Sequence, residues 1–305
     1  MIDFRTPELS DRGWVDELFF AGNHRGCEYS FSILFCWKDA YQQKVARVND
    51  FAVQYLSGMI GPAYPFPVGR GDVKPVLELM MEDARERGEP FRLICVDNSD
   101  RELLDALYPG QFTYTEDRFG FDYLYLIDRL ADLKGKKLHG KRNHIHRFEE
   151  NCPDWRAEPI TADNLADCLA MDMEWNRLNR GADEAAEESR SEEGAAIRLA
   201  IENYDALGLE GLLIRTGGRV VAFTMGRKLC EDTYDVHFEK AYSDIQGAYP
   251  IVNREFARMI RASHPEIVYL NREDDMGVEG LRKAKLSYYP DLMVEKHSAM
   301  LKTEA

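Results

Sequence analysis

The order of expected secondary structure occurs twice along this chain of 305 residues, and this repetition limits the folds open to it. In residues 211–226, two apolar runs flank Gly217 and Gly218, which is typical of a β-hairpin. A third strand, a helix, a short apolar strand, a short helix and a closing strand are expected after it, at residues 232–238, 249–262, 266–270, 278–286 and 291–298.

The first half shows the same order of hairpin, helix, strand, short helix and closing strand, at residues 45–56, 72–87, 91–96, 102–108 and 121–126. No repeat is visible residue by residue, so the shared order alone suggests a duplication. It predicts an α/β (α+β) fold with two domains, each a mixed sheet flanked by helices. The expected boundaries are residues 1–128, a basic connecting segment at 129–150, and residues 151–305.

The strand expected at residues 266–270 ends in a run of polar residues: Asn271, Arg272, Glu273, Asp274 and Asp275. A short helix that carries Arg282, Lys283 and Lys285 follows. Ligand sites in α/β folds collect at the C-terminal ends of strands and at the helix starts after them. The alternative is a solvated turn with an aspartate N-cap, in which Glu273 and Asp274 form ion pairs with Arg282 and Lys285.

A neighbouring strand is expected to reach the same edge. Glu239 follows the strand at residues 232–238 and is a further candidate for this site. His237 lies two residues earlier on the same strand face, where it serves the site or is a satisfied core histidine.

Residues 134–147 carry six basic residues and no acid in a chain of net charge −15. The acidic total argues against a protein that coats nucleic acid nonspecifically. The basic run instead predicts a local exposed surface, on a helix from about Gly140, for a phosphate-bearing partner. Nucleotide, tRNA and phospholipid head groups all fit, and a plain solvated face is the alternative. The residues predicted to form this phosphate-binding surface are Lys136, Lys137, Lys141, Arg142 and Arg147.

Other patterns narrow the class of protein. The six cysteines form no CxxC pair, the N-terminus has no signal-peptide core, and no window of 18 apolar residues occurs, so the cytoplasm is the expected location. Peripheral contact with a membrane stays open. No GxSxG, HExxH or P-loop is present, and no metal site is expected. The acidic residues 181–194 are interpreted as an exposed loop, with a lid over a site as the alternative.

Three pieces of the chain, LKGKKLHGKRNHIHRF, YLNREDDMG and GLRKAKLSYYP, together resemble an uncharacterised bacterial family. That family is related to the C-terminal catalytic domain of phosphatidylglycerol lysyltransferases and to Fem-type aminoacyl transferases. The resemblance covers nearly the whole chain and implies two tandem GNAT-like (acyl-CoA N-acyltransferase) domains. It also implies transfer of an aminoacyl group from aminoacyl-tRNA to an amine or hydroxyl acceptor.

This reaction class suggests roles for the candidate residues. Glu273, Asp274 or Glu239 would orient the amine or accept a proton, and Tyr288 would protonate the leaving hydroxyl. Positive charge for phosphate or an oxyanion would come from Arg272, Arg282 and Lys285, with Asn271 beside them. No cofactor is required by this chemistry. Acetyl-CoA stays open, because residues 243–250 keep only Gly247 of a pyrophosphate loop.

Two alternatives to an aminoacyl transferase remain at this point. One is a noncatalytic GNAT-like protein that binds a nucleotide or small ligand, and the other is a CoA-dependent N-acyltransferase. The chain also departs from the lysyltransferases in having no membrane-embedded portion, which puts a lipid acceptor in question.

Overall fold

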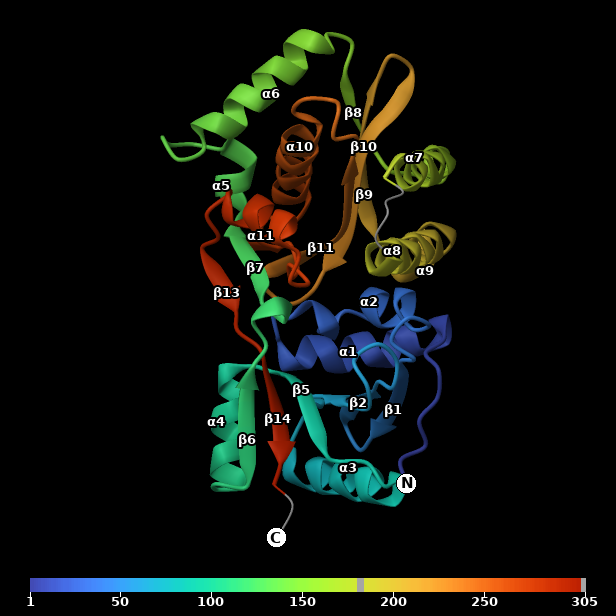
Figure 1. Ribbon diagram of the computed structural model, residues 1–305, viewed down its shortest axis with the longest axis vertical. Helices are drawn as coiled ribbons and strands as arrows, with labels where there is room; N and C mark the ends of the chain where they lie inside the picture. Colours follow the sequence, from blue (N-terminus) through green and yellow to red (C-terminus); the bar gives the residue numbers. More distant parts are fainter. Residues whose placement is uncertain (180–183, 303–305) are drawn as a thin grey trace. The chain divides into compact units, whose positions relative to one another are not determined.

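The computed structural model describes residues 1–179 and 184–302 and groups the chain in two compact units (Figure 1). Unit 1 combines Met1–Tyr123, Glu273–Lys283 and Met293–Ala305, and unit 2 combines Leu124–Arg272 and Ala284–Leu292. Both units are therefore built from segments that are far apart in the sequence.

Unit 1 contains two small sheets, with strand orders β1-β2-β4 and β3-β5-β14-β6. The strands are β1 (Lys44–Val48), β2 (Phe51–Tyr55), β3 (Tyr64–Pro65), β4 (Val68–Gly69), β5 (Arg92–Val96), β6 (Phe112–Glu116) and β14 (His297–Leu301). The helices are η1 (Leu9–Asp11), α1 (Arg12–Gly22), η2 (Cys27–Tyr29), α2 (Phe31–Cys36), α3 (Lys74–Arg87), α4 (Asn98–Leu107) and η3 (Arg118–Gly120).

Helix α3 shows how local sequence sets the limits of an element. Pro75 lies in its first turn, where no N–H is needed, and Gly88 ends it in the left-handed conformation at φ 71°. Its apolar stripe buries Leu77 and Met80 in the core of unit 1, together with Leu93 of β5. The expected order of hairpin, helix, strand and short helix is thus present in unit 1.

Unit 2 is built on a seven-stranded mixed sheet of order β13-β7-β12-β11-β10-β9-β8. Its strands are β7 (Asp122–Leu126), β8 (Arg156–Pro159), β9 (Glu210–Thr216), β10 (Arg219–Lys228), β11 (Thr233–Ala241), β12 (Tyr269–Asn271) and β13 (Leu292–Val294). The helices are α5 (Ile127–Asp132), α6 (His139–Asn151), α7 (Leu165–Leu178), α8 (Glu184–Glu202), α9 (Tyr204–Leu207), α10 (Ala248–Ser263) and α11 (Glu279–Leu286), the last of which begins in unit 1.

Gly217 and Gly218 have φ of 58° and 78° and form the tight turn between β9 and β10.

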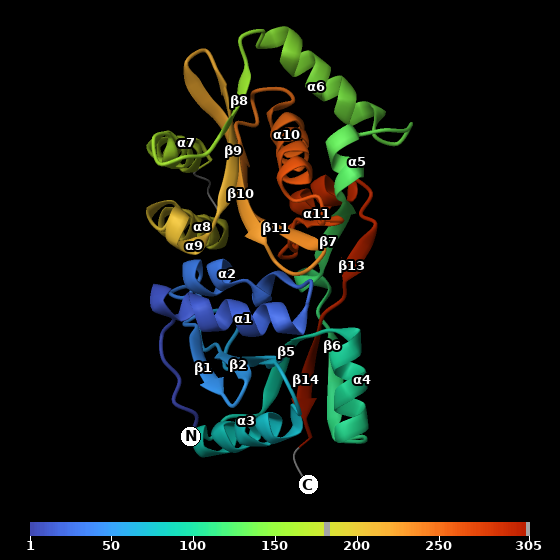
Figure 2. The same cartoon turned by 180° about the vertical axis from the view of Figure 1, so that it is seen from behind.

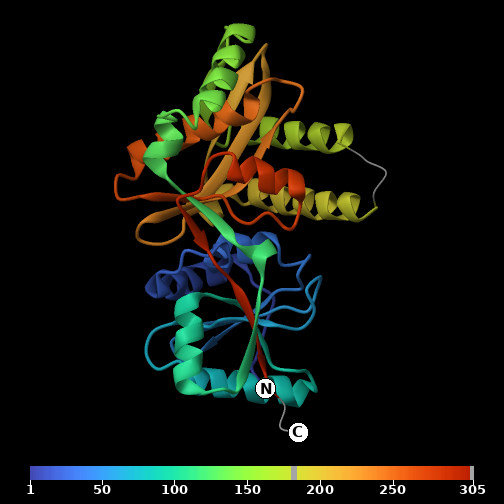
Figure 3. The same cartoon turned by 60° about the vertical axis from the view of Figure 1, so that its left-hand side comes forward.

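Helices cover both faces of this sheet. Helix α10 packs its apolar stripe, which includes Ile251 and Phe256, on β9, β10 and β11. Helices α7 and α8 lie side by side on the opposite face (Figures 2 and 3).

The closing strands differ from the expected plan. The first half was expected to close with its own strand, yet β7 lies in the seven-stranded sheet between β13 and β12. The closing strand expected at residues 291–298 is two strands, β13 and β14, which belong to different sheets. Strand pairing over this sequence distance cannot be deduced from local periodicity. The predicted boundaries at residues 128 and 150 stay predictions, and the compact units differ from them in being discontinuous.

The acidic segment at residues 181–194 was predicted to be a loop. Residues 180–183 lie outside the described residues, and helix α8 begins at Glu184, so the loop prediction is wrong for residues 184–194. Alanines and glutamates favour a helix intrinsically, and in this segment that propensity outweighs the repulsion between the acids.

Candidate functional site

The C-terminal end of β12 places one arginine beside a glutamate from the neighbouring strand. Arg272 follows the last residue of β12, and its Nη2 donates to Glu239 Oε1 of β11 at 2.7 Å. Strands β11 and β12 are parallel neighbours, so both side chains emerge at one edge of the sheet. Asn253 of α10 donates from Nδ2 to the other oxygen of Glu239 at 3.2 Å.

Three further side chains complete this group. Tyr288 lies below the Arg272 guanidinium, 4.9 Å from ring centre to Cζ. The Lys141 ammonium, from α6, lies over the same ring at 3.9 Å. Lys285 of α11 donates from Nζ to the carbonyl of Arg272 at 2.5 Å. We call Lys141, Glu239, Arg272, Lys285 and Tyr288 the Arg272 cluster.

Positive charge exceeds negative charge in the Arg272 cluster, which contains three cations and one carboxylate. The side chains of Arg272 and Glu239 are only 13% and 12% exposed. Burial, and then the charge of Arg272, lower the pKa of Lys141 to about 8, against a smaller opposing effect of Glu239. A lysine in this state exchanges a proton near neutral pH far more readily than a surface lysine.

Several polar atoms in and beside the Arg272 cluster have no protein partner among the residues that the structure describes. Arg272 Nη1 and Asn253 Oδ1 are buried without one. The hydroxyl of Tyr288, a residue only 4% exposed, also has none within the described chain. Buried polar groups are rarely left unpaired in folded proteins unless a function requires it. This edge of unit 2 therefore offers free donors and a free acceptor.

The other residues that were predicted for this site lie outside the Arg272 cluster. Asn271 is fully buried in β12. Glu273, Asp274 and Arg282 belong to the segment that groups with unit 1. Asp274 is half-buried and accepts from the Met276 amide at 3.0 Å, and Glu273 has a φ of 55°. The structure thus brings together Arg272, Lys285, Tyr288 and Glu239 of the predicted set.

The acid that anchors this segment is Asp275, one residue beyond the predicted ion pairs. It is fully buried and accepts from Arg282 Nε and Nη2, both at 2.8 Å, and from the Tyr123 hydroxyl at 2.6 Å. Arg118 adds a fourth contact at 3.3 Å. Burial opposes ionisation, but the hydrogen bonds from Arg282 and Tyr123 outweigh it and hold the pKa of Asp275 well below its usual range. Asp275 and Arg282 therefore serve the local fold of unit 1.

The basic segment was predicted to be one exposed surface, and this is wrong for two of its residues. Lys136, Lys137 and Arg147 are exposed, but Lys141 and Arg142 are half-buried. Arg142 donates to the carbonyls of Leu133 and Gly135 at the end of α5. Lys141 turns into the Arg272 cluster instead. Because α6 has several faces and Lys136 and Lys137 precede it, the basic run need not form one surface.

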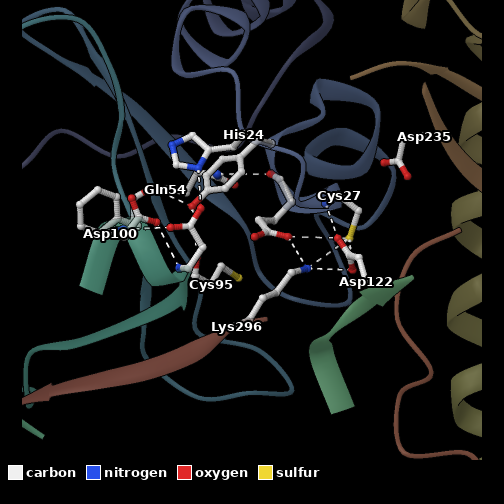
Figure 4. Close-up of polar contacts among 12 residues, drawn as sticks. His24, Cys27, Gln54, Cys95, Asp100, Asp122, Asp235 and Lys296 are labelled. Atoms are coloured by element: carbon white, nitrogen blue, oxygen red, sulfur yellow. Dashed lines mark hydrogen bonds and ion pairs between the residues drawn. The ribbon is translucent and has the colours of Figure 1, made fainter. Parts of the chain in front are cut away.

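A second group of buried charges lies in unit 1, where Figure 4 shows Lys296 reaching Asp122 and Cys27. Its ammonium is 2.6 Å from Glu28 and 2.9 Å from Asp122. Cys27, Glu28 and Asp122 are close enough to hold a metal ion, but the lysine ammonium already supplies the positive charge there. Burial opposes this charge, yet the pKa of Lys296 is raised because Asp122 and Cys27 lie against it. This group links the residue before β14 to Glu28 and Asp122.

The β5 strand end carries the third group. Asp97 accepts from the amide of Asp100 at 2.9 Å and caps α4, and it lies 3.4 Å from His24 Nδ1. These residues line a hollow of about 650 Å³. Most of their hydrogen-bonding capacity is used by the capping box, in which Asp100 also accepts from the Asp97 amide.

Gly247, the remnant of a pyrophosphate loop, is needed for helix packing. A side chain there would meet the carbonyl oxygen of His144 at 2.2 Å and Phe148 Cβ at 2.8 Å, both on α6. Its φ of 88° also favours glycine. The glycine is thus explained without a bound pyrophosphate, and the use of acetyl-CoA stays a prediction.

Two residues of the site were missed by sequence reasoning. Lys141 was assigned to the basic surface, and nothing local distinguishes it from its neighbours. Asn253 was passed over, although a polar residue inside the apolar stripe of α10 is a detectable signal.

The mixed α/β fold of this chain is that of GNAT-like and Fem-type proteins, which confirms the predicted fold class. Residues 20–300 match the family described as phosphatidylglycerol lysyltransferase, C-terminal, and the chain belongs to that family. The predicted family relationship is confirmed.

Solved structures share the fold over nearly the whole chain. A conserved protein of unknown function from Bacteroides thetaiotaomicron is 41% identical, with a TM-score of 0.92 over 99% of this chain and 100% of that one. L-PGS from Bacillus licheniformis has a TM-score of 0.66 at 15% identity, over 98% and 93% of the two chains. FemX has a TM-score of 0.56 at 8% identity, over 97% of each.

One curated relative, an uncharacterized protein of Mycoplasmoides gallisepticum, is 25% identical over 179 residues, which are 58% of this chain. The match spans 54% of the length of that relative. Among residues 1–179 and 184–302, no helix combines the length and apolar composition needed to cross a membrane.

Proposed function

We propose that this protein transfers an aminoacyl group from aminoacyl-tRNA to an amine or hydroxyl acceptor, with the Arg272 cluster as its reaction site. The observation that carries this proposal is the buried Arg272 guanidinium at the end of β12, held by Glu239 and left with one unpartnered N–H group. A preorganised cation of this kind is what an acyl-transfer site needs near the developing oxyanion.

An aminoacyl ester is already activated, so the protein mainly has to position the two substrates. The acceptor N–H or O–H attacks the ester carbonyl carbon, a C–N or C–O bond forms, and the bond to the ribose oxygen breaks. The proton of the acceptor passes to the leaving ribose oxygen. Arg272 stabilises the oxyanion, and the Tyr288 hydroxyl and Lys141 ammonium are the groups placed to move the proton. No cofactor enters these steps.

The site also has hydrogen-bond acceptors that suit the amine of the aminoacyl-tRNA. Glu239 accepts from Asn253 Nδ2, and the Oδ1 atom of Asn253 has no donor among the described residues, so both side chains offer oxygen atoms to a ligand. They would hold the ammonium group of the aminoacyl moiety. The separate prediction that Glu273 or Asp274 orients an amine or accepts a proton is tested by the neutral variants Glu273→Gln and Asp274→Asn.

The family description supplies the first donor and acceptor to try, which are lysyl-tRNA and phosphatidylglycerol. The exposed lysines of the basic segment, Lys136 and Lys137, would attract the tRNA or an anionic lipid surface. A tRNA donor would place the reaction in the cytoplasm.

The test is a transfer assay with the purified chain. A pool of tRNA charged with radiolabelled amino acids is supplied with phosphatidylglycerol vesicles or with water-soluble amines, and label in the acceptor is measured. Arg272→Lys keeps the charge but loses the fixed guanidinium, and it is expected to lower kcat/KM by about 10²–10³-fold. Thermal unfolding of the variant provides the control for folding.

The competing functions give different results. A nucleotide retained by the purified protein, with no transfer from any charged tRNA, would support a noncatalytic binding protein. Transfer from acyl-CoA that persists without tRNA would support a CoA-dependent N-acyltransferase.

A further inference from the structure

Strand β6 is the outer strand of the four-stranded sheet of unit 1 and lies beside β14 (Figure 1). Its five residues pair with β14 in an unbroken antiparallel register, from Phe112 opposite Leu301 to Glu116 opposite His297. No strand within the described part of the chain pairs with its other side. Such an edge is a template to which a further strand can be added.

The phase of the ladder shows which main-chain groups point away from β14. The amide of Asp117 donates to Lys296, and the amide of Lys302 donates to Gln111. In an antiparallel ladder such hydrogen-bonded pairs alternate with residues whose N–H and C=O groups face outward. The outward residues of β6 are therefore Phe112, Tyr114 and Glu116. Their main-chain groups have no other partner among residues 1–179 and 184–302.

The edge of β6 lacks the features that usually protect an edge strand. Native proteins use lysine, proline, a bulge or a very short strand for this purpose, and β6, with the sequence FTYTE, has none of them. Of the other edge strands that the structure describes, β1 carries Lys44 and Arg47, and β8 ends in Pro159. Strands β3 and β4 have two residues each, and β13 has three. The edge of β6 is thus the exception in this chain.

We propose that β6 pairs with β6 of a second copy of this chain, antiparallel and about a two-fold axis at Tyr114. The middle of the strand, Thr113-Tyr114-Thr115, reads the same in both directions, so the strand is complementary to itself. Tyr114 comes opposite Tyr114 of the partner subunit, and Thr113 comes opposite Thr115 of the partner subunit. Both threonine side chains are exposed in the single chain, and threonine pairs across strands stabilise a sheet.

Hydrogen bonds and charge both suit this register. Every outward N–H group of the two copies finds a carbonyl, three from each copy, which gives six main-chain hydrogen bonds. Like charges stay apart, because Glu116 comes opposite Phe112 of the partner subunit and Asp117 opposite Gln111 of the partner subunit. The two four-stranded sheets become one continuous sheet. Since both copies use the same edge, the assembly closes as a dimer.

The edge is accessible, and the expected interface is small. Helix α4 packs on one face of the sheet, where Asp105 accepts from the Tyr114 hydroxyl at 2.9 Å, and it leaves the edge open (Figure 3). One strand from each copy makes a small interface, so we expect a dissociation constant in the micromolar range or weaker. This dimer is independent of the proposed function, because β6 contributes no residue to the Arg272 cluster.

Sedimentation velocity of the full chain over a range of concentrations tests the proposal. Moderate salt is used, because the net charge of −15 makes two copies repel each other at low ionic strength. We expect a concentration-dependent shift from monomer to dimer. Glu116→Pro removes one outward N–H from each copy and should raise Kd about ten-fold or more, while the bonds to β14 stay intact. Glu116→Gln keeps that N–H and should change Kd by less than about three-fold.

Disulfide trapping tests the register. In the proposed dimer the two Cα atoms at position 114 lie about 5.5 Å apart, which is within the range of a disulfide. Mild oxidation of the Tyr114→Cys variant should therefore give a covalent dimer, with the new disulfide located by mass spectrometry. The matched control is Glu116→Cys, whose two Cα atoms lie roughly 14 Å apart and should not be linked. The six native cysteines are the same in both variants.

The proposal is overturned if the chain sediments as a monomer at every concentration, or if a dimer forms that Glu116→Pro leaves unchanged. Equal cross-linking of Tyr114→Cys and Glu116→Cys also overturns it, because the strands would then not meet in this register. Thermal unfolding shows whether Glu116→Pro is folded. If it is not, the two cysteine variants decide the question by themselves.

Discussion

The strand ends of β5 and β12 begin from the same local pattern and become different sites. Each strand is apolar, ends in several polar residues and is followed by a short helix, α4 or α11. At β5, Asp97 caps α4 and pairs with His24, so its carboxylate is used by neighbours. At β12, Arg272 pairs across to β11 and keeps a free N–H group.

The difference lies in what the rest of each unit supplies. The β5 end receives one histidine and is rich in acids, with Asp97, Asp100 and Glu295 around its hollow. The β12 end receives Lys141 from α6 and Lys285 from α11 and is rich in cations. A polar strand end therefore identifies a place where a site can form, while elements distant in sequence decide the charge of that site.

The sharpest test of this comparison is catalytic. Arg272→Lys is expected to lower kcat/KM for aminoacyl transfer by about 10²–10³-fold, because the lost interaction forms with the oxyanion. Asp97→Asn at the matching place after β5 should stay within about two-fold of the original chain, because asparagine also caps a helix. Equal losses in both variants would show that the two strand ends do not differ in function.

Stability should distinguish the two neighbouring aspartates after β12. Asp275→Asn removes the buried partner of Arg282 and is expected to lower the free energy of unfolding by about 2–4 kcal/mol. Asp274→Asn removes a half-buried turn acceptor and should cost no more than about 0.5 kcal/mol. Urea unfolding of both variants measures this, and the reverse order would make Asp274 the structural residue.

Protonation of Asp100 at the β5 end should have a smaller effect on the free energy of unfolding. Burial, and then the charge of Asp97, raise the pKa of Asp100 to about 7. Its folded-state pKa is above the unfolded value, so the folded state holds this proton more tightly and loses stability as pH rises from 4 towards 7. Asp100→Asn is expected to reduce that loss by about 1 kcal/mol or more. The measurement is the free energy of unfolding of both proteins at pH 5 and pH 7.5. An equal change between the two pH values in both proteins would contradict the prediction.

The smallest expected effect separates the two roles of the basic segment. Lys136→Met with Lys137→Met removes exposed charge and should weaken tRNA or anionic vesicle binding a few-fold, with a salt dependence that is less steep by roughly one unit per lost contact. The kcat at saturation should be unchanged, because neither residue belongs to the Arg272 cluster. A large fall in kcat would place these lysines in the reaction site.

Local sequence determined the elements of this fold. Proline and glycine at the ends of α3, the Gly217-Gly218 turn and the apolar stripe of α10 each act over a few residues, and their structure follows from backbone geometry. The same reasoning placed Arg272, Lys285, Tyr288 and Glu239 at one strand edge. The dense run of acids in α8 suggests a loop, yet helix propensity decides its structure.

The tertiary structure alone decided three features. Strands β7 and β14 pair in sheets that local periodicity could not assign, since strand partners are chosen by burial across long sequence separations. Lys141 and Arg142 left the basic surface because α6 turns them towards Tyr288 and the end of α5. Asp275, and not Asp274, is the buried partner of Arg282, because Arg118, Tyr123 and Arg282 all donate to it. A sequence fixes which charges a chain has, but their energies depend on desolvation and on partners that only the folded chain brings within a few ångströms.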